Sequence, residues 1–211
     1  MFPDDFNKQA LELIQEKKHN EAAIMLREAV HAMPEGWMPL ETSEAGAVVR
    51  SWSDDEFEAF RDWYLGCGGS GEVKWEWPSY SHAWYLLSAI YVDHERYDDA
   101  LRLLSEGVQL ERDHPDLLCE GGFILHRLGD LESAQKAYEA ALAARPWVTA
   151  RQKARSLRGL SSVLTDLDRL SEAEALLADA LALEPDNEIT ARGLEHLRGR
   201  LAATVKPDQV D

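Results

Sequence analysis

The chain has 211 residues, of which 45% are apolar and 29% charged, as is usual for one or two soluble globular domains. Its 39 acidic and 22 basic residues give a formal charge of −17, which argues against nucleic acids and anionic membranes as partners. No apolar run is long enough for a membrane span, and the first residues lack the basic and apolar regions of a secretory signal. Two cysteines are too few for a disulfide framework. These features predict a cytoplasmic protein.

Four segments share one spacing of small and apolar residues: 3–36, 81–114, 115–148 and 154–187. Each segment holds two small residues seven positions apart, which would let two helices cross closely: Ala22 and Ala29, Ala100 and Gly107, Ala134 and Ala141, Ala173 and Ala180. A proline follows three of the four segments' second helices, where it stops helix continuation. The spacing predicts a helix pair in each segment.

The third segment carries the fullest pattern, with Leu118, Gly121, Gly122, Leu125, Ala134, Tyr138, Ala141 and Pro146. This pattern resembles the tetratricopeptide repeat, a helix–turn–helix unit of 34 residues. The resemblance implies an all-α, right-handed superhelix of four repeats, in one solenoid domain over residues 1–205. One helix pair cannot bury its own apolar face, so neighbouring repeats must stack.

Residues 37–80 form an insertion between the first and second repeats and hold five of the seven tryptophans. Ser53 and Glu56 fit a capping box, which predicts a helix running to about Leu65 with aromatic residues on one face. Residues 72–77 alternate polar and apolar side chains, a short-strand pattern. This segment is either an extended strap or a strand paired with residues 48–50, and we favour the strap.

The aromatic residues of the insertion have two interpretations, which are compatible. They plug the junction between the first two repeats, or some of them, with Trp63, Trp75 and Trp77 as candidates, are exposed as a partner-binding patch. Self-association into a homodimer through these aromatics is a structural alternative.

After the fourth repeat, residues 188–203 predict a solvating cap helix, the end piece that a solenoid needs. Residues 206–211 predict a disordered tail.

Motifs for catalysis and metal binding do not occur in the sequence. The glycine-rich run at 66–71 lacks the following helix and Lys-Ser or Lys-Thr pair of a phosphate-binding loop. The seven histidines do not have metal-ligand spacing, and the acidic run at 54–56 is interpreted as a solvated helix start. The sequence therefore predicts a protein without enzymatic activity, cofactor or metal.

The family resemblance also implies a concave surface lined by the first helix of each repeat. Its positions in this chain are Asn7, Leu11, Ile14, His82, Tyr85, Ala89, Val92, Cys119, Phe123, His126, Arg127, Arg155, Arg158 and Ser162. One branch of the family grips chaperone C-terminal carboxylates with a Lys/Asn/Asn/Lys/Arg clamp. The corresponding positions here include Asp116 and Glu120, so this clamp is not expected.

Six of these positions are candidates for partner binding: Tyr85, Phe123, His126, Arg127, Arg155 and Arg158. The arginines would converge on one surface and bind an acidic or aromatic anchor of a peptide. The competing interpretation is that they form local ion pairs with Asp166 or Glu120.

The sequence thus predicts a non-enzymatic module that binds a protein or peptide through the concave surface, the aromatic insertion or both. The alternative is a dedicated acidic neutraliser, meaning an immunity protein or secretion chaperone for a basic toxin or effector. Only the net charge and the small size favour that alternative.

Overall fold

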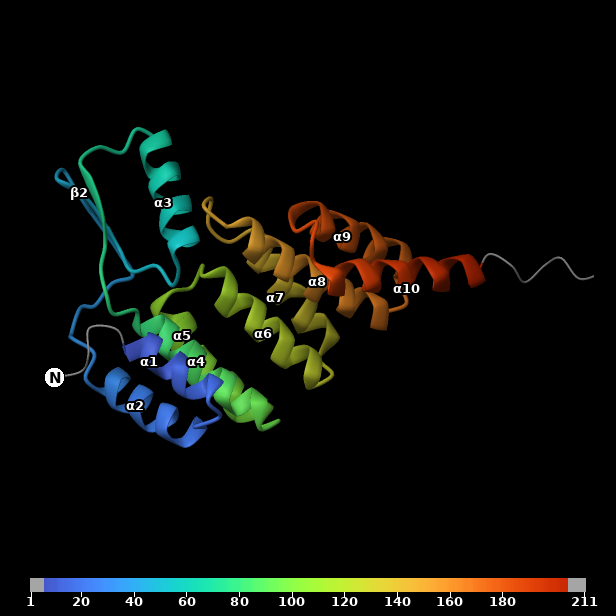
Figure 1. Ribbon diagram of the computed structural model, residues 1–211, viewed down its shortest axis with the longest axis horizontal. Coiled ribbons are helices and arrows are strands. Elements are labelled where there is room, and N and C mark those ends of the chain that lie inside the picture. Colours follow the sequence, from blue (N-terminus) through green and yellow to red (C-terminus); the bar gives the residue numbers. More distant parts are fainter. Residues whose placement is uncertain (1–5, 205–211) are drawn as a thin grey trace, which may run out of the picture.

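The computed structural model describes residues 6–204, so the tail predicted at 206–211 lies outside the described residues. Four antiparallel helix pairs follow one another along a curved stack, and a further helix closes its C-terminal end (Figure 1). The helices are α1 (Phe6–Gln15), α2 (His19–His31), α4 (Tyr80–Asp93), α5 (Tyr97–Leu110), α6 (Pro115–Arg127), α7 (Leu131–Leu142), α8 (Ala150–Asp166), α9 (Leu170–Leu183) and α10 (Glu188–Thr204). The expected helical solenoid is confirmed.

The small residues lie where each pair crosses. Ala22, Ala100, Ala134 and Ala173 are all fully buried, as are three of the residues seven positions later. Close packing at these points is possible because an alanine adds only one methyl group between the two backbones.

All four hairpins close with the same turn, although only one of them uses glycine. The turn residue has a positive φ in each case: Lys17, Glu95, Gly129 and Asp168. The next amide N–H donates to a carbonyl five residues back, as from Arg96 to Tyr91 and from Arg169 to Leu164. This is the Schellman hydrogen bond that ends a helix, so the four turns are equivalent in geometry despite different side chains.

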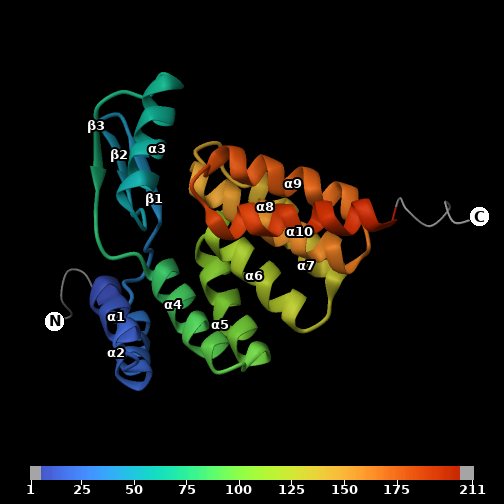
Figure 2. The same cartoon turned by 45° about the vertical axis from the view of Figure 1, so that its right-hand side comes forward.

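The insertion folds into a helix and a small sheet that stand beside the N-terminal half of the stack (Figure 2). The strands are β1 (Leu40–Ser43), β2 (Gly46–Val49) and β3 (Glu72–Trp75), and the helix is α3 (Asp54–Gly66). β2 lies in the centre, antiparallel to β1 and parallel to β3, with Val48 opposite Lys74 and Val49 opposite Trp75. The expectation of an unpaired strap is therefore wrong. β1 pairs with only one edge of β2, so the other edge is available to β3. Because α3 lies between β2 and β3 in the chain, β3 can run parallel to β2.

Helix α3 packs its aromatic face on this sheet. Phe60 is fully buried with Ala47 and Val49 of β2. The Ser53 hydroxyl accepts the amide N–H of Glu56 at 3.4 Å, as expected for an N-cap. The Glu56 carboxylate, however, accepts the amide N–H of Trp52 at 2.7 Å, one residue before the cap.

Tyr138 of α7 fills the space between α6 and α8 because both helices carry a glycine where its ring lies. A methyl group on Gly159 would overlap the ring, and one on Gly122 would lie 3.0 Å from it. We expect Gly159→Ala to lower the free energy of unfolding by ~1–3 kcal/mol through overpacking. Gly199→Ala, with open space around it, should instead raise it by ~0.5–1 kcal/mol. Urea denaturation of the two variants checks this, and equal effects would contradict it.

Candidate functional site

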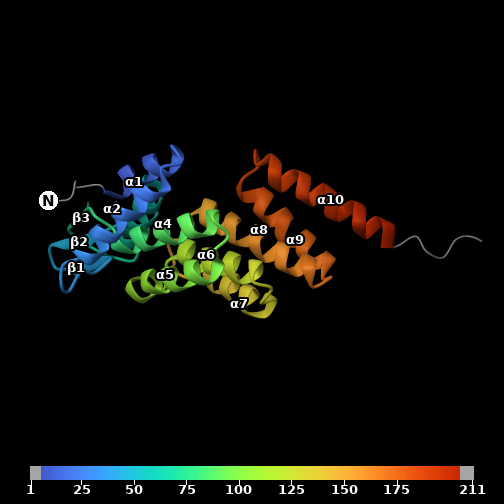
Figure 3. The same cartoon turned by 90° about the horizontal axis from the view of Figure 1, so that it is seen from below.

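The first helices of the four pairs form the inner surface of the stack. α1 contacts α4, α4 contacts α6, and α6 contacts α8, whereas the second helices do not contact one another to the same extent. Viewed from below, α4, α6 and α8 lie in a row with α1 and α10 rising at the two ends (Figure 3). The arrangement makes this side concave, and we call it the concave surface.

Phe123 lies on α6, near the middle of the concave surface, and 38% of its surface is exposed. One turn further on, His126 Nε2 lies 2.7 Å from Asp166 Oδ2 of α8. Asp166 is thus the partner of a histidine, not of an arginine. Arg127 turns toward α5, where its Nε donates to the Tyr97 hydroxyl at 3.0 Å.

The other two arginines on the concave surface pair separately. Arg155 binds two carboxylates of α6, Asp116 at 2.9 Å and Glu120 at 2.5 Å. Arg158 pairs with Glu184, at the end of α9. The structure therefore does not bring Arg127, Arg155 and Arg158 together; each has its own partner, and only Arg155 has the Glu120 partner weighed from the sequence.

Tyr85 of α4 lies beneath these groups. The guanidinium carbon of Arg155 is 5.8 Å from its ring centroid, and the Trp52 ring is 5.1 Å away. Burial raises the pKa of Tyr85 to about 12, so it stays a neutral phenol at physiological pH. Tyr85 acts here as part of the floor under Arg155.

We expect Arg155→Glu to destabilise the protein, because it would place a third carboxylate beside Asp116 and Glu120. Breaking a buried ion pair from one side costs ~3–5 kcal/mol, and the partial exposure of Arg155 lowers this to ~1–3 kcal/mol. Arg127→Glu is the matched control, since its hydrogen-bond partner is a neutral hydroxyl. Thermal melts check the pair: similar melting temperatures for both variants would contradict the expectation.

Two of the three candidate tryptophans, Trp63 and Trp75, are half-buried. The Trp63 ring packs 4.5 Å from that of Trp147, in the loop between α7 and α8. Trp75 donates its indole N–H to the Ser51 carbonyl at 3.1 Å and packs against Phe57. Trp77 stacks near Trp75 but keeps 37% of its surface exposed.

A pocket of about 290 Å³ opens where the insertion meets the first helices α1 and α4. Its lining residues are Asn7, Lys8, Leu11, Trp52, Ser53, Asp54, Trp75, Trp77 and His82, and we call it the tryptophan pocket. Two buried polar atoms in this lining, Asn7 Oδ1 and His82 Nδ1, have no hydrogen-bond partner among the described residues. The sequence predicted three of these lining residues as concave-surface positions: Asn7, Leu11 and His82. It gave no signal that Trp52 would line the same pocket.

The opposite end of the concave surface has a second pocket, between α8 and α10. It has a volume of about 330 Å³, and its lining includes Arg158, Ser162, Ile189 and His196. Ile189 is the most exposed large apolar side chain among the described residues. The concave surface thus carries one exposed aromatic residue between two pockets.

Glu56 is the residue that sequence reasoning misplaced. Interpreted as part of a solvated helix start, it is 1% exposed and binds groups from three distant parts of the chain. Its carboxylate lies 3.0 Å from His114 Nε2, 3.3 Å from Arg145 and 3.4 Å from the Gln152 amide.

Burial alone would raise the pKa of Glu56, but contact with His114 and Arg145 outweighs burial and holds that pKa well below its ordinary value. The Arg145 guanidinium also binds Glu111, at 2.7 Å. These contacts tie α3 to the N-terminal ends of α6 and α8. The insertion is therefore fastened along the edge of several repeats, beyond the junction of the first two.

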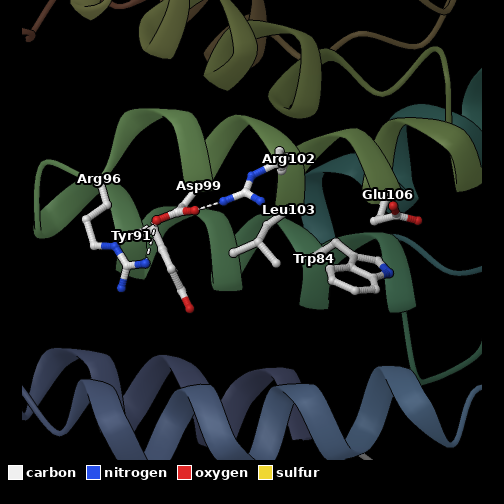
Figure 4. Close-up of a pocket in the computed structure, with 7 residues that line it drawn as sticks. All are labelled: Trp84, Tyr91, Arg96, Asp99, Arg102, Leu103 and Glu106. Atoms are coloured by element: carbon white, nitrogen blue, oxygen red, sulfur yellow. Dashed lines mark hydrogen bonds and ion pairs between the residues drawn. The ribbon is translucent and has the colours of Figure 1, made fainter.

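Another pocket lies on α4 and α5 where they face the first helix pair (Figure 4). Three of its four charged side chains pair with one another, because Asp99 binds both Arg96 and Arg102. Among residues 6–204, no three His, Cys, Asp or Glu side chains are placed to hold a metal ion. None of the helices in that range combines the length and apolar character needed to cross a membrane.

Comparison with known proteins agrees with the fold. Residues 116–146 match the tetratricopeptide repeat family model, within the third predicted repeat. The chain contains a tetratricopeptide repeat at residues 116–146. A comparison of its sequence with curated proteins gives no match.

Several solved structures resemble this chain in fold. A Pseudomonas aeruginosa PilF structure has a TM-score of 0.66 at 14% identity, covering 95% of this chain and 69% of PilF. MamA from Desulfovibrio magneticus has a TM-score of 0.58 at 14% identity, covering 93% and 84%. The first repeat domain of RPAP3, bound to an HSP90 peptide, has a TM-score of 0.52 at 20% identity, covering 58% and 93%.

Proposed function

We propose that this protein is a non-catalytic interaction module that holds a segment of a protein partner on its concave surface. The observation that carries the proposal is the exposure of Phe123 between the tryptophan pocket and the pocket at α10. Aromatic residues are enriched at protein interfaces, and binding hot spots cluster near the centre of the interface. The RPAP3 domain, which shares the fold, was solved with a bound peptide, and this likeness supports the same use of the surface.

The test replaces Phe123 with glutamate and compares what the wild type and the variant retain from cells of the native host. Ile24→Glu is the matched control, because Ile24 is exposed on α2, a second helix, away from the concave surface. We expect proteins retained by the wild type and Ile24→Glu to be lost from Phe123→Glu, identified by mass spectrometry and confirmed by calorimetry. Retention of the same proteins by Phe123→Glu would refute the proposal.

A second candidate is the neutralisation of a basic toxin or effector, which the formal charge of −17 favours. Electrostatic steering predicts that association with such a partner slows by ~10-fold or more between low salt and ~0.5 M salt. Stopped-flow measurements of association with the captured partner check this. A rate that does not depend on salt would remove this candidate and leave the interaction module standing.

A further inference from the structure

The tryptophan pocket has a chemistry of its own. Trp52, Trp75 and Trp77 of the insertion supply aromatic walls, and α1 and α4 supply the opposite side. Trp75 and Trp77 lie with their ring centroids 4.7 Å apart. Their faces carry the negative end of the aromatic quadrupole, which attracts cations.

The two unpartnered atoms belong to side chains that are almost fully buried. Asn7 is 1% exposed, and its amide nitrogen donates to the Ser79 carbonyl at 2.7 Å, which leaves Oδ1 as a hydrogen-bond acceptor without a donor. His82 is 7% exposed and stacks on Trp52 with centroids 4.4 Å apart. Buried polar atoms without partners are rare, and at a pocket wall they favour a ligand that supplies the missing partner.

The charges at the pocket favour a donor that carries positive charge. Asp54 lines the pocket, is exposed, and forms no salt bridge with any of residues 6–204. Lys8, which also lines the pocket, is already engaged in an interaction. Burial lowers the pKa of His82 to about 3, so its imidazole is neutral at physiological pH and does not repel a cation.

We infer that the tryptophan pocket binds a cationic side chain, arginine or lysine, of the protein partner. The alkyl stem lies against the tryptophan rings, Asp54 neutralises the charged head, and Asn7 Oδ1 accepts one of its hydrogens. An anionic or purely apolar anchor would leave the Asn7 acceptor and the Asp54 charge unmatched. The inference rests on the proposed function, since it names the chemistry of one anchor on the partner.

The test uses small probes, so its outcome does not depend on the identity of the partner. N-acetyl-arginine methylamide and N-acetyl-lysine methylamide are titrated into the full chain, and the indole N–H signals are followed by NMR. N-acetyl-citrulline methylamide is the neutral control because it has nearly the shape of the arginine probe. We expect saturable shifts of the Trp75 and Trp77 signals with the cationic probes. The citrulline probe should bind at least ~10-fold more weakly than the arginine probe.

Asp54→Asn and Asp55→Asn form the matched pair of variants, since both residues are exposed in the first turn of α3 and only Asp54 lines the pocket. We expect Asp54→Asn to weaken binding of the cationic probes by ~5-fold or more and Asp55→Asn to leave it unchanged. Citrulline binding as tightly as arginine, equal losses in the two variants, or no shifts at all would each overturn the inference. Such a failure would leave the Phe123→Glu experiment unaffected, so the two proposals fail separately.

Discussion

Arg145→Met is expected to lower the free energy of unfolding by ~3–5 kcal/mol, because it would leave two carboxylates buried without their cation. Arg145 is 7% exposed and lies between Glu56 and Glu111, which are as deeply buried. The Ser81 hydroxyl still donates to Glu111, at 2.5 Å, but a neutral donor does not replace a charge. Detachment of the insertion from the repeats should accompany the loss, because the Glu56–Arg145 contact joins the two.

The measurement is urea denaturation followed by tryptophan fluorescence, which reports on the insertion because it holds five of the seven tryptophans. Arg169→Met is the control, since Arg169 forms an exposed pair with Glu172 and its loss should hardly change stability. Equal destabilisation by the two variants would show that the buried network does not hold the insertion in place.

Acid should destabilise the protein through two buried groups, His82 and Glu56. Burial lowers the pKa of His82 from its ordinary 6.5 to about 3, so the folded protein keeps this imidazole neutral. The unfolded chain gains a proton there below pH 6.5, so stability is lost as the pH falls from about 6.5 toward 3, at up to ~1.4 kcal/mol per pH unit. Glu56 adds to the loss only below its ordinary value of 4.5, because its lowered pKa favours the folded state above that pH.

The variant His82→Gln isolates the contribution of His82 to this pH dependence. This variant should be less stable than the wild type at pH 8, yet lose stability less steeply between pH 6.5 and 4.5. His196→Gln is the control, since His196 is exposed on α10 and should leave the steep dependence intact. Denaturation curves at half-unit pH intervals make the comparison, and a His82→Gln slope as steep as that of the wild type would contradict the assignment.

The placement of Glu56 shows why part of the candidate site could not be predicted. Serine followed three residues later by glutamate is a local signature of a helix N-terminus, and Ser53 does cap α3. Whether such a glutamate is solvated depends on what packs against it. Here His114, Arg145 and Gln152, which are remote in sequence, pack against the Glu56 carboxylate and exclude solvent from it.

The arginines of the concave surface follow the same logic. Their positions on first helices follow from helical periodicity, but their direction depends on where a carboxylate or hydroxyl lies on a neighbouring helix. Arg127 donates a hydrogen bond to Tyr97 of α5, and Arg158 forms a salt bridge with Glu184, just after α9. Long side chains reach partners within several ångströms of their base, so a shared face does not ensure a shared cluster.

By itself, the sequence determined the helix pairs and the solenoid, because small residues at fixed spacing and apolar periodicity act through neighbours within one or two turns. It also determined that Ser53 caps the N-terminus of α3. Only the tertiary structure decided that β3 pairs with β2 across an intervening helix, that Glu56 is buried, and that Trp52, Trp75 and Trp77 meet Asn7 and His82 around one pocket. These features join residues far apart in the chain, and such contacts depend on how complete elements pack, which no local pattern records.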